Sequence, residues 1–238
     1  MAGGSVPAPE ERADPESSGA GWRLPSPETP TLSELFASGA RDSGATGFLL
    51  AQLPRGKPLL WVQERMAMLE AGRIYPPGLG IGELIHVAAR DARSALWAME
   101  EGLRCSTLGA VIGEIWGDPK ALDFTATRRL AVAAERTGVA AYLIRLGGHA
   151  NLSGARMRWR VTSAPSLAHP LDPKAPGQPA WDAELFRARG LAPGRWSIAC
   201  DAQRQTMRVV SHDGAADRVD LVAAPRDRAL VEGQRRVG

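Results

Sequence analysis

Four short apolar runs dominate the middle of the chain, and polar or amphipathic segments separate them. Their length and composition predict buried strands at residues 59–62, 83–89, 108–116 and 139–147. Amphipathic helices are predicted between the later runs. The segment "DARSALWAMEEGLR" begins with Asp91 as a plausible N-cap residue, and its apolar side chains recur on one helical face, namely Ala92, Ala95, Leu96, Met99 and Leu103.

A second helix is predicted in "DFTATRRLAVAAERTG", which opens on Asp123 and ends at Gly138. Strands that alternate with helices imply right-handed crossovers and a mostly parallel sheet covered on both faces. We therefore expect an α/β fold.

The pattern changes after Leu146. The segments "RMRWRVTSAP", "WDAELFRARG" and "RWSIACD" resemble strands of an antiparallel C-terminal extension. A proline-rich connection, "SAPSLAHPLDPKAPGQPAW", joins the first two. Such a long connection is expected to be either mobile or a contact surface.

The two ends of the chain have a different composition. Residues 1–30 are rich in Pro, Gly, Ser and Glu, so we expect a disordered tail, and residues 213–238 are expected to form a second loose tail. The folded domain would span residues 31–212. At its start, Thr31 and Glu34 have the spacing of a capping box, which predicts a short helix.

Composition adds limits on size, charge and compartment. With 238 residues and 44% hydrophobic content, one sizeable domain is expected. The net charge is +3, but the chain is acidic through Leu50 and basic from Val139 onward. An arginine-rich half is compatible with an acidic or nucleic-acid partner, although a solvated surface is the commoner explanation. Cys105 and Cys200 are expected to be reduced, packed thiols. No long apolar run or signal-like start is present, so we expect a cytoplasmic protein.

One short stretch lies close to a phosphate-binding loop. The pattern G-x-x-x-x-G-K-[ST] is matched by Gly39, Gly44 and Thr46 in "GARDSGAT", but Ala45 stands at the lysine position. Glu64 and Glu114 lie at the ends of predicted strands, where ligands collect in such sheets. Taken alone, either carboxylate is also compatible with a helix cap or a surface residue.

The order of these segments resembles the RecA ATPase core from about residue 32 to 200. Blocks such as "LWAMEEGLRC", "GEIWGDPKALDFTATRRLAVAAERTGV" and "RMRWRV" are similar to the proteobacterial branch of the ImuA family, the RecA-related proteins of inducible-mutagenesis cassettes. The resemblance implies that Glu64 stands at the position of the water-orienting carboxylate and Glu114 at that of the central-strand acid. Because Ala45 lacks the charge that pairs with phosphates, we expect no catalysis and no ATP cofactor or metal.

The resemblance also implies partners. An ImuA-type protein is expected to bind ImuB, a relative of Y-family polymerases, and to support an error-prone DnaE-type polymerase in lesion bypass; a RecA filament end is a further candidate. The segments that correspond to the DNA-contacting loops of RecA are short, so little direct DNA binding is expected. Two alternatives stay open: a weak nucleotide switch using Glu64 and Glu114, and a division-inhibitor role like that of SulA.

Three arginines alternate along one predicted strand. Arg156, Arg158 and Arg160 would share an outward face. A simple amphipathic strand explains this pattern without a partner, and a partner-binding face is the alternative. His86 is expected to be a satisfied strand side chain, and His149 is the histidine on a candidate functional loop. Six tryptophans are interpreted as packing residues, namely Trp61, Trp97, Trp116, Trp159, Trp181 and Trp196.

Overall fold

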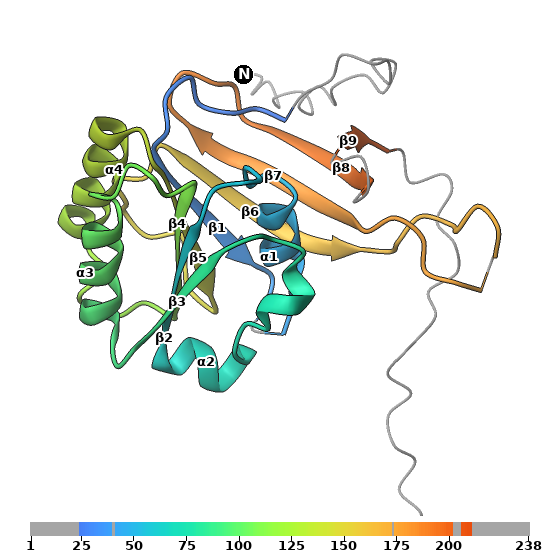
Figure 1. The fold of residues 1–238 in the computed structure, drawn as a ribbon. Helices are drawn as coiled ribbons and strands as arrows, with labels where there is room; N and C mark the ends of the chain where they lie inside the picture. The colour runs from blue at the N-terminus through green and yellow to red at the C-terminus, as the bar shows by residue number, and fades with distance from the viewer. Residues whose placement is uncertain (1–23, 40, 173, 202–205, 211–238) are drawn as a thin grey trace, which may run out of the picture.

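The computed structural model describes residues 24–39, 41–172, 174–201 and 206–210, which form one sheet flanked by helices (Figure 1). The sheet has nine strands in the order β3-β2-β4-β5-β1-β6-β7-β8-β9. The strands are β1 Leu32–Ala37, β2 Leu59–Glu64, β3 Leu84–Ala89, β4 Ala110–Trp116, β5 Ala140–Leu146, β6 Met157–Ala164, β7 Ala180–Ala188, β8 Gly194–Asp201 and β9 Thr206–Val209. The helices are α1 Gly44–Leu50, α2 Arg65–Ala71, the 3-10 turn η2 Pro76–Leu79, α3 Ala92–Gly102 and α4 Phe124–Thr137.

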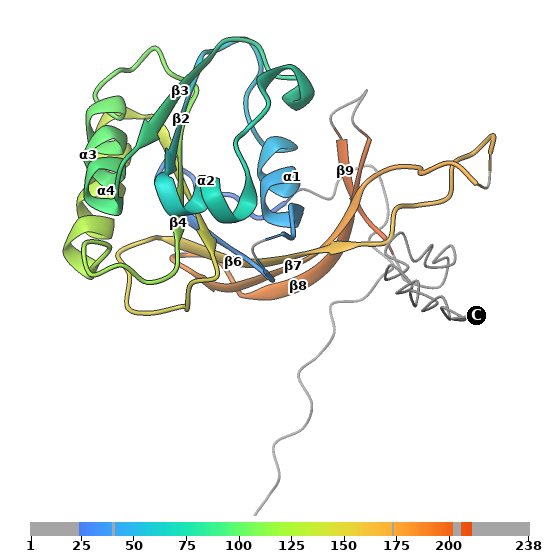
Figure 2. The same ribbon diagram turned by 90° about the horizontal axis from the view of Figure 1, so that it is seen from below.

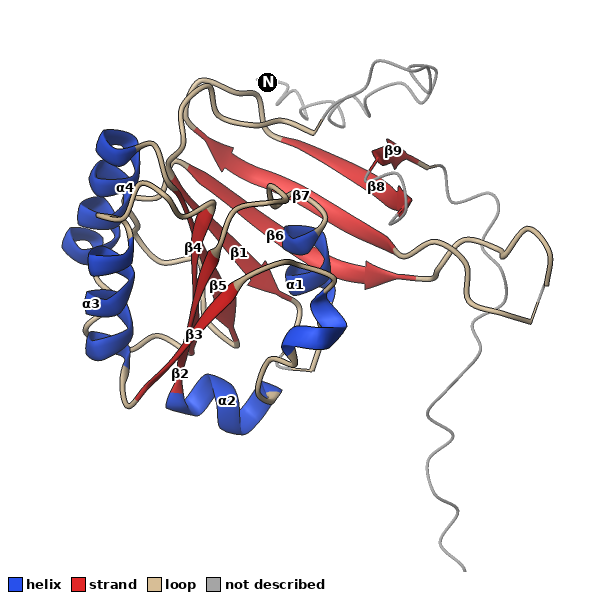
Figure 3. Cartoon of the chain, in the orientation of Figure 1, coloured by secondary structure: helices blue, strands red, loops and turns tan. Residues whose placement is uncertain are grey.

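Strands β3 through β6 in this order are parallel, and β7 to β9 add antiparallel pairs. Helices α3 and α4 cover one face of the parallel part, whereas α1 and α2 lie on the other (Figures 2 and 3). Consecutive residues of a strand point to opposite faces, so Val62 packs in the α3/α4 layer and Trp61 in the α1/α2 layer. The predicted α/β fold is confirmed, and the arrangement is consistent with a RecA-like core.

The predicted helices are confirmed together with their ends. The Asp91 side chain accepts a hydrogen bond from the Ser94 amide at 2.7 Å, and Asp123 accepts one from the Ala126 amide at 2.7 Å. Gly138 follows α4 with φ +74°, a left-handed conformation that favours glycine. Asx caps and a terminal glycine are local signals, which is why the sequence was sufficient here.

The predicted helix at Thr31–Glu34 is wrong, because these residues enter β1. This strand lies between β5 and β6 and pairs in parallel with both, so a helix here would leave two neighbouring strands without partners. The Thr31 hydroxyl donates to Glu135 at 3.3 Å instead of capping a helix. Tertiary pairing therefore overrides the capping-box spacing.

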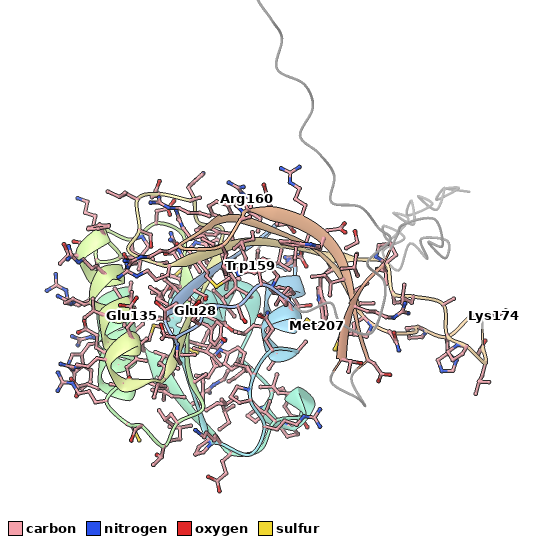
Figure 4. The ribbon with its side chains drawn as sticks, turned by 90° about the horizontal axis from the view of Figure 1, so that it is seen from above. Glu28, Glu135, Trp159, Arg160, Lys174 and Met207 are labelled. Carbon is pink, nitrogen blue, oxygen red and sulfur yellow. The ribbon has the colours of Figure 1, made fainter. Side chains whose placement is uncertain are left out.

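The antiparallel extension curves around helix α1 (Figure 2). Helix α1 packs on its inner side, where the Phe48 ring lies 5.3 Å from that of Trp159 and 6.2 Å from that of Trp181. Among the described elements, no helix covers the outer face of β6 to β8 (Figures 2 and 4). The long proline-rich connection between β6 and β7, described at residues 165–172 and 174–179, projects from the body (Figures 1 and 2), and we call it the arm.

The packing predictions hold for some residues and fail for others. Trp61, Trp159 and Trp181 are buried, but Trp97 is 63% exposed because it points away from the buried side of α3. Cys200 is buried, whereas Cys105 is an exposed thiol. The interpretation of both cysteines as packed is therefore wrong for Cys105.

The two predicted tails fall mainly outside the described residues, which begin at 24 and end at 210, so the proposed domain limits stay predictions. Within the part of the chain that is described, none of the helices has the length and apolar character needed to cross a bilayer.

Candidate functional site

The loop that resembles a phosphate-binding motif contains its own carboxylate. The Asp42 side chain accepts hydrogen bonds from the Gly44 amide at 2.8 Å and from the Ser163 hydroxyl at 2.5 Å. It also accepts the Ser163 amide, at 3.2 Å to Oδ2, and the Ser38 hydroxyl. Burial alone would raise the pKa of Asp42, but these hydrogen bonds outweigh burial and lower the pKa. An anionic side chain thus lies against the first amide of α1.

The residue at the lysine position points into the core. Ala45 is 0% exposed and packs in the layer that contains Phe48. A Cβ on Gly44 would lie 2.6 Å from the Ser163 amide nitrogen, so glycine is needed for the loop to approach β6. Gly44, Ala45 and Thr46 form the first turn of α1, while Gly39 stands at the start of the loop.

The central-strand acid, Glu114, is held by two donors from β2. Its carboxylate accepts the Trp61 indole N–H at 2.9 Å and the Gln63 amide at 2.7 Å. Burial raises the pKa of Glu114, and these two hydrogen bonds oppose the rise without cancelling it. The acid therefore joins β4 to β2 inside the sheet.

Gln63 extends this connection, and sequence reasoning missed it. Its amide nitrogen also donates to the Gly72 carbonyl at 3.1 Å, and its oxygen accepts the Ile74 amide at 3.0 Å. The His86 ring Nε2 lies 3.1 Å from the same oxygen, where it acts as a donor because an amide oxygen only accepts. One glutamine thus ties β2 to the segment after α2 and to β3.

The other predicted acid faces a different way. Gln63 is opposite Glu114 in the β2–β4 pair, so Glu64, the next residue, points to the other face of the sheet. The Glu64 carboxylate accepts the Trp116 amide at 3.3 Å. The two carboxylates therefore do not converge on one point.

A buried ionic network joins β1, β5 and β6, and the sequence did not predict it. Glu34, 0% exposed, accepts the Arg158 Nε–H at 2.7 Å and the Ser153 hydroxyl at 2.9 Å, and Arg145 Nη1 lies 3.7 Å from its carboxylate. A buried carboxylate is tolerated when opposite charges and donors surround it. Three strands, β1, β5 and β6, are thereby connected by charge.

The network continues to the loops after β4 and β5. Arg145 Nη2 donates to Asp118 at 2.6 Å and to the Gly117 carbonyl at 3.1 Å. Burial lowers the pKa of Arg145, and Glu34 and Asp118 oppose that effect. Asp118 also lies 2.7 Å from His149 Nδ1 and accepts the His149 backbone amide, so this exposed histidine is anchored to the sheet.

No protein-family model matches the chain. The curated Protein ImuA of Caulobacter vibrioides strain NA1000 is 33% identical over 196 residues, which covers 77% of this chain and 74% of the relative. The chain belongs to the ImuA family. The Protein ImuA of Caulobacter vibrioides strain ATCC 19089 gives the same identity and coverage, so the resemblance inferred from the sequence blocks is confirmed.

In this ImuA-family chain the three arginines of the segment 156–160 differ in exposure: one is buried and two lie nearer the surface. Arg158 is 3% exposed and ion-paired with Glu34, so the prediction of a shared outward face is wrong for it. Arg156 Nε donates to Glu135 at 2.7 Å. The Arg160 side chain is 52% exposed and donates to Glu184 at 3.0 Å.

Two phenylalanines explain how Arg158 becomes buried. Its guanidinium carbon lies 5.2 Å from the centroid of the Phe36 ring and 5.3 Å from that of Phe186. Arg145 lies 5.3 Å from the Phe36 centroid and Arg160 4.1 Å from that of Phe186, so cations and rings alternate across β5, β1, β6 and β7. The alternation of residues along β6 predicted that the three arginines share one face of the strand. It did not predict that Phe36 and Phe186 cover Arg158 or that Arg158 pairs with the buried Glu34.

The described residues contain no group of three His, Cys, Asp or Glu side chains placed to hold a metal ion.

Proposed function

We propose that this ImuA-family chain is a non-catalytic accessory protein of a damage-inducible mutagenesis assembly. It would bind an ImuB-type relative of Y-family polymerases and support an error-prone DnaE-type polymerase during translesion synthesis. The identity with Protein ImuA over 77% of the chain supports the family role. The RecA-like sheet would act as a docking scaffold.

The placement of Asp42 carries the non-catalytic part of the proposal. A nucleotide phosphate in this loop would have to displace a carboxylate already bonded to Gly44 and Ser163, and would meet its negative charge. With Ala45 buried, no cation at the lysine position offsets that cost. A nucleotide switch would further require Glu114 to leave its bonds to Trp61 and Gln63.

The surface around Arg156 and Arg160 is our candidate contact for an acidic partner. Both guanidiniums are held in place by carboxylates, yet the Arg160 side chain keeps half of its surface accessible. Arg158 would not touch the partner; its ion pair with Glu34 would hold β6 in position. The short loops after β4 and β5 favour a protein partner over direct DNA binding, with a RecA filament as a second candidate.

Co-purification of the full-length chain with the ImuB protein of the same organism tests the proposal. We expect a complex that weakens as salt rises, and weakens further in the Arg156→Ser, Arg160→Ser double variant. The matched control is Arg93→Ser with Arg104→Ser, two exposed arginines around α3. Absence of a complex would contradict the proposed function, whereas equal loss in both double variants would exclude this surface alone.

A further inference from the structure

The arm between β6 and β7 projects from the body of the molecule (Figures 1 and 2). Its base is closed by a hydrogen bond from the Leu167 amide to the Gln178 carbonyl at 2.9 Å and by a bridge between Ala168 and Pro176. Figures 1 and 2 show the arm extending away from the sheet and the helical layers. Its backbone packs tightly, since a Cβ on Gly177 would lie 2.0 Å from the Leu167 carbonyl oxygen.

At the tip of the arm, Leu171 lies in a turn that is held by hydrogen bonds. His169 Nδ1 accepts the backbone amides of Leu171 at 3.3 Å and Asp172 at 3.1 Å, and the Asp172 carbonyl accepts the Ala175 amide at 3.1 Å. Leu171 is 89% exposed, the highest value among the large hydrophobic side chains of the described residues. A preorganised apolar tip loses little conformational entropy on binding.

A partly apolar cavity lies at the amino ends of β1, β5 and β6. Its volume is about 310 Å³, and its lining includes Leu35, Phe48, Tyr142, Met157 and Trp159. An apolar cavity of about 150 Å³ accepts a benzene ring, so this one has room for a leucine side chain and part of its turn. Residues 25–28 form one wall of it and place Glu28 at the cavity.

The cavity borders Met157 at the start of β6, whereas the arm begins after Ala164 at the end of that strand. Figure 4 shows Lys174 at the far end of the arm, well away from Glu28 and Trp159. The arm therefore does not reach the cavity of its own chain. Among the described residues, neither the Lys174 ammonium nor the Glu28 carboxylate forms a salt bridge, which leaves each available for the other across a contact.

We propose that this chain self-associates head to tail, with Leu171 of one copy inserted into the cavity of a second copy and Lys174 paired with its Glu28. The contact is heterologous, so it produces rings or open chains of subunits. It uses no nucleotide and no polymerase partner. Its test is therefore independent of the function proposed above.

The experiment is analytical ultracentrifugation of the full-length chain over a concentration series up to several hundred micromolar. We expect the average mass to rise with concentration, and Leu171→Asp to weaken association by about tenfold or more because a buried apolar side chain is lost. Leu152→Asp is the matched control, since Leu152 is 71% exposed and lies on the loop before β6. Lys174→Glu and Glu28→Lys should each weaken association, and the double variant should restore it.

A photo-crosslinking amino acid at position 171 identifies the receiving surface. Crosslinks to the lining of the cavity in a second copy, which lies within residues 25–35, 48–52, 140–142 and 157–159, support the proposal. A chain that stays monomeric at every concentration overturns it. Association that Leu171→Asp leaves unchanged, or crosslinks confined to other segments such as residues 1–23, would also overturn it.

Discussion

Replacing Arg158 by methionine should cost far more stability than the same change at Arg160, although the two residues lie on one strand. Arg158 is 3% exposed and bonded to Glu34, which is 0% exposed. Removing one partner of a buried ion pair typically costs about 3–5 kcal/mol, because the remaining charge stays buried. Glu34 keeps the Ser153 hydroxyl and Arg145 nearby, so we expect the lower end, about 3 kcal/mol.

Arg160→Met removes a half-exposed ion pair with Glu184. Surface pairs contribute about 0–1 kcal/mol, so a loss near 0.5 kcal/mol is expected. Urea unfolding, followed by tryptophan fluorescence, measures the free energy of unfolding of both variants, and Trp159 in the same strand is a reporter. Similar losses for the two variants, or a loss below about 1 kcal/mol for Arg158→Met, would refute the buried network as a stabilising element.

Three further outcomes follow from the site. Ala45→Lys should destabilise the fold by more than about 3 kcal/mol, since it places a charge and extra volume in a fully buried position, whereas Ser43→Lys on the exposed side of the same loop should cost little; thermal unfolding distinguishes them. Because burial raises the pKa of Glu114 above its ordinary value of 4.5, the native state binds more protons than the unfolded state above that pH, so this contribution to stability falls as pH rises. The stability difference between wild type and Glu114→Gln should therefore decline from about pH 4.5 upward, and a constant difference would contradict this. Isothermal titration of Mg-ATP into the wild-type chain should show weak or no binding, and micromolar affinity would exclude the role assigned to Asp42.

The sequence predicted the parallel core because its signals there are local. The apolar runs of β2 to β5, the Asp caps of α3 and α4, and Gly138 after α4 each act within a few residues. The capping-box spacing at Thr31 misled for the same reason: it is a local signal, and the non-local pairing of β1 with β5 and β6 outweighs it.

The site was less predictable because its contacts join distant segments. Glu34 meets Arg158 across 124 positions, and Asp42 meets Ser163 across 121. Alternation along β6 placed the arginines on one face, but it did not show that Phe36 and Phe186 cover the middle one. The Gly-rich spacing located the loop, while the occupation of that loop by Asp42 depends on how closely β6 approaches.

The most direct test of the account is the affinity of the full-length chain for the ImuB protein of its own organism, measured by biolayer interferometry with and without Mg-ATP. The account predicts binding with the same dissociation constant in both conditions, because the loop that would receive the nucleotide is occupied by Asp42. No detectable binding, or binding that requires Mg-ATP, would contradict it.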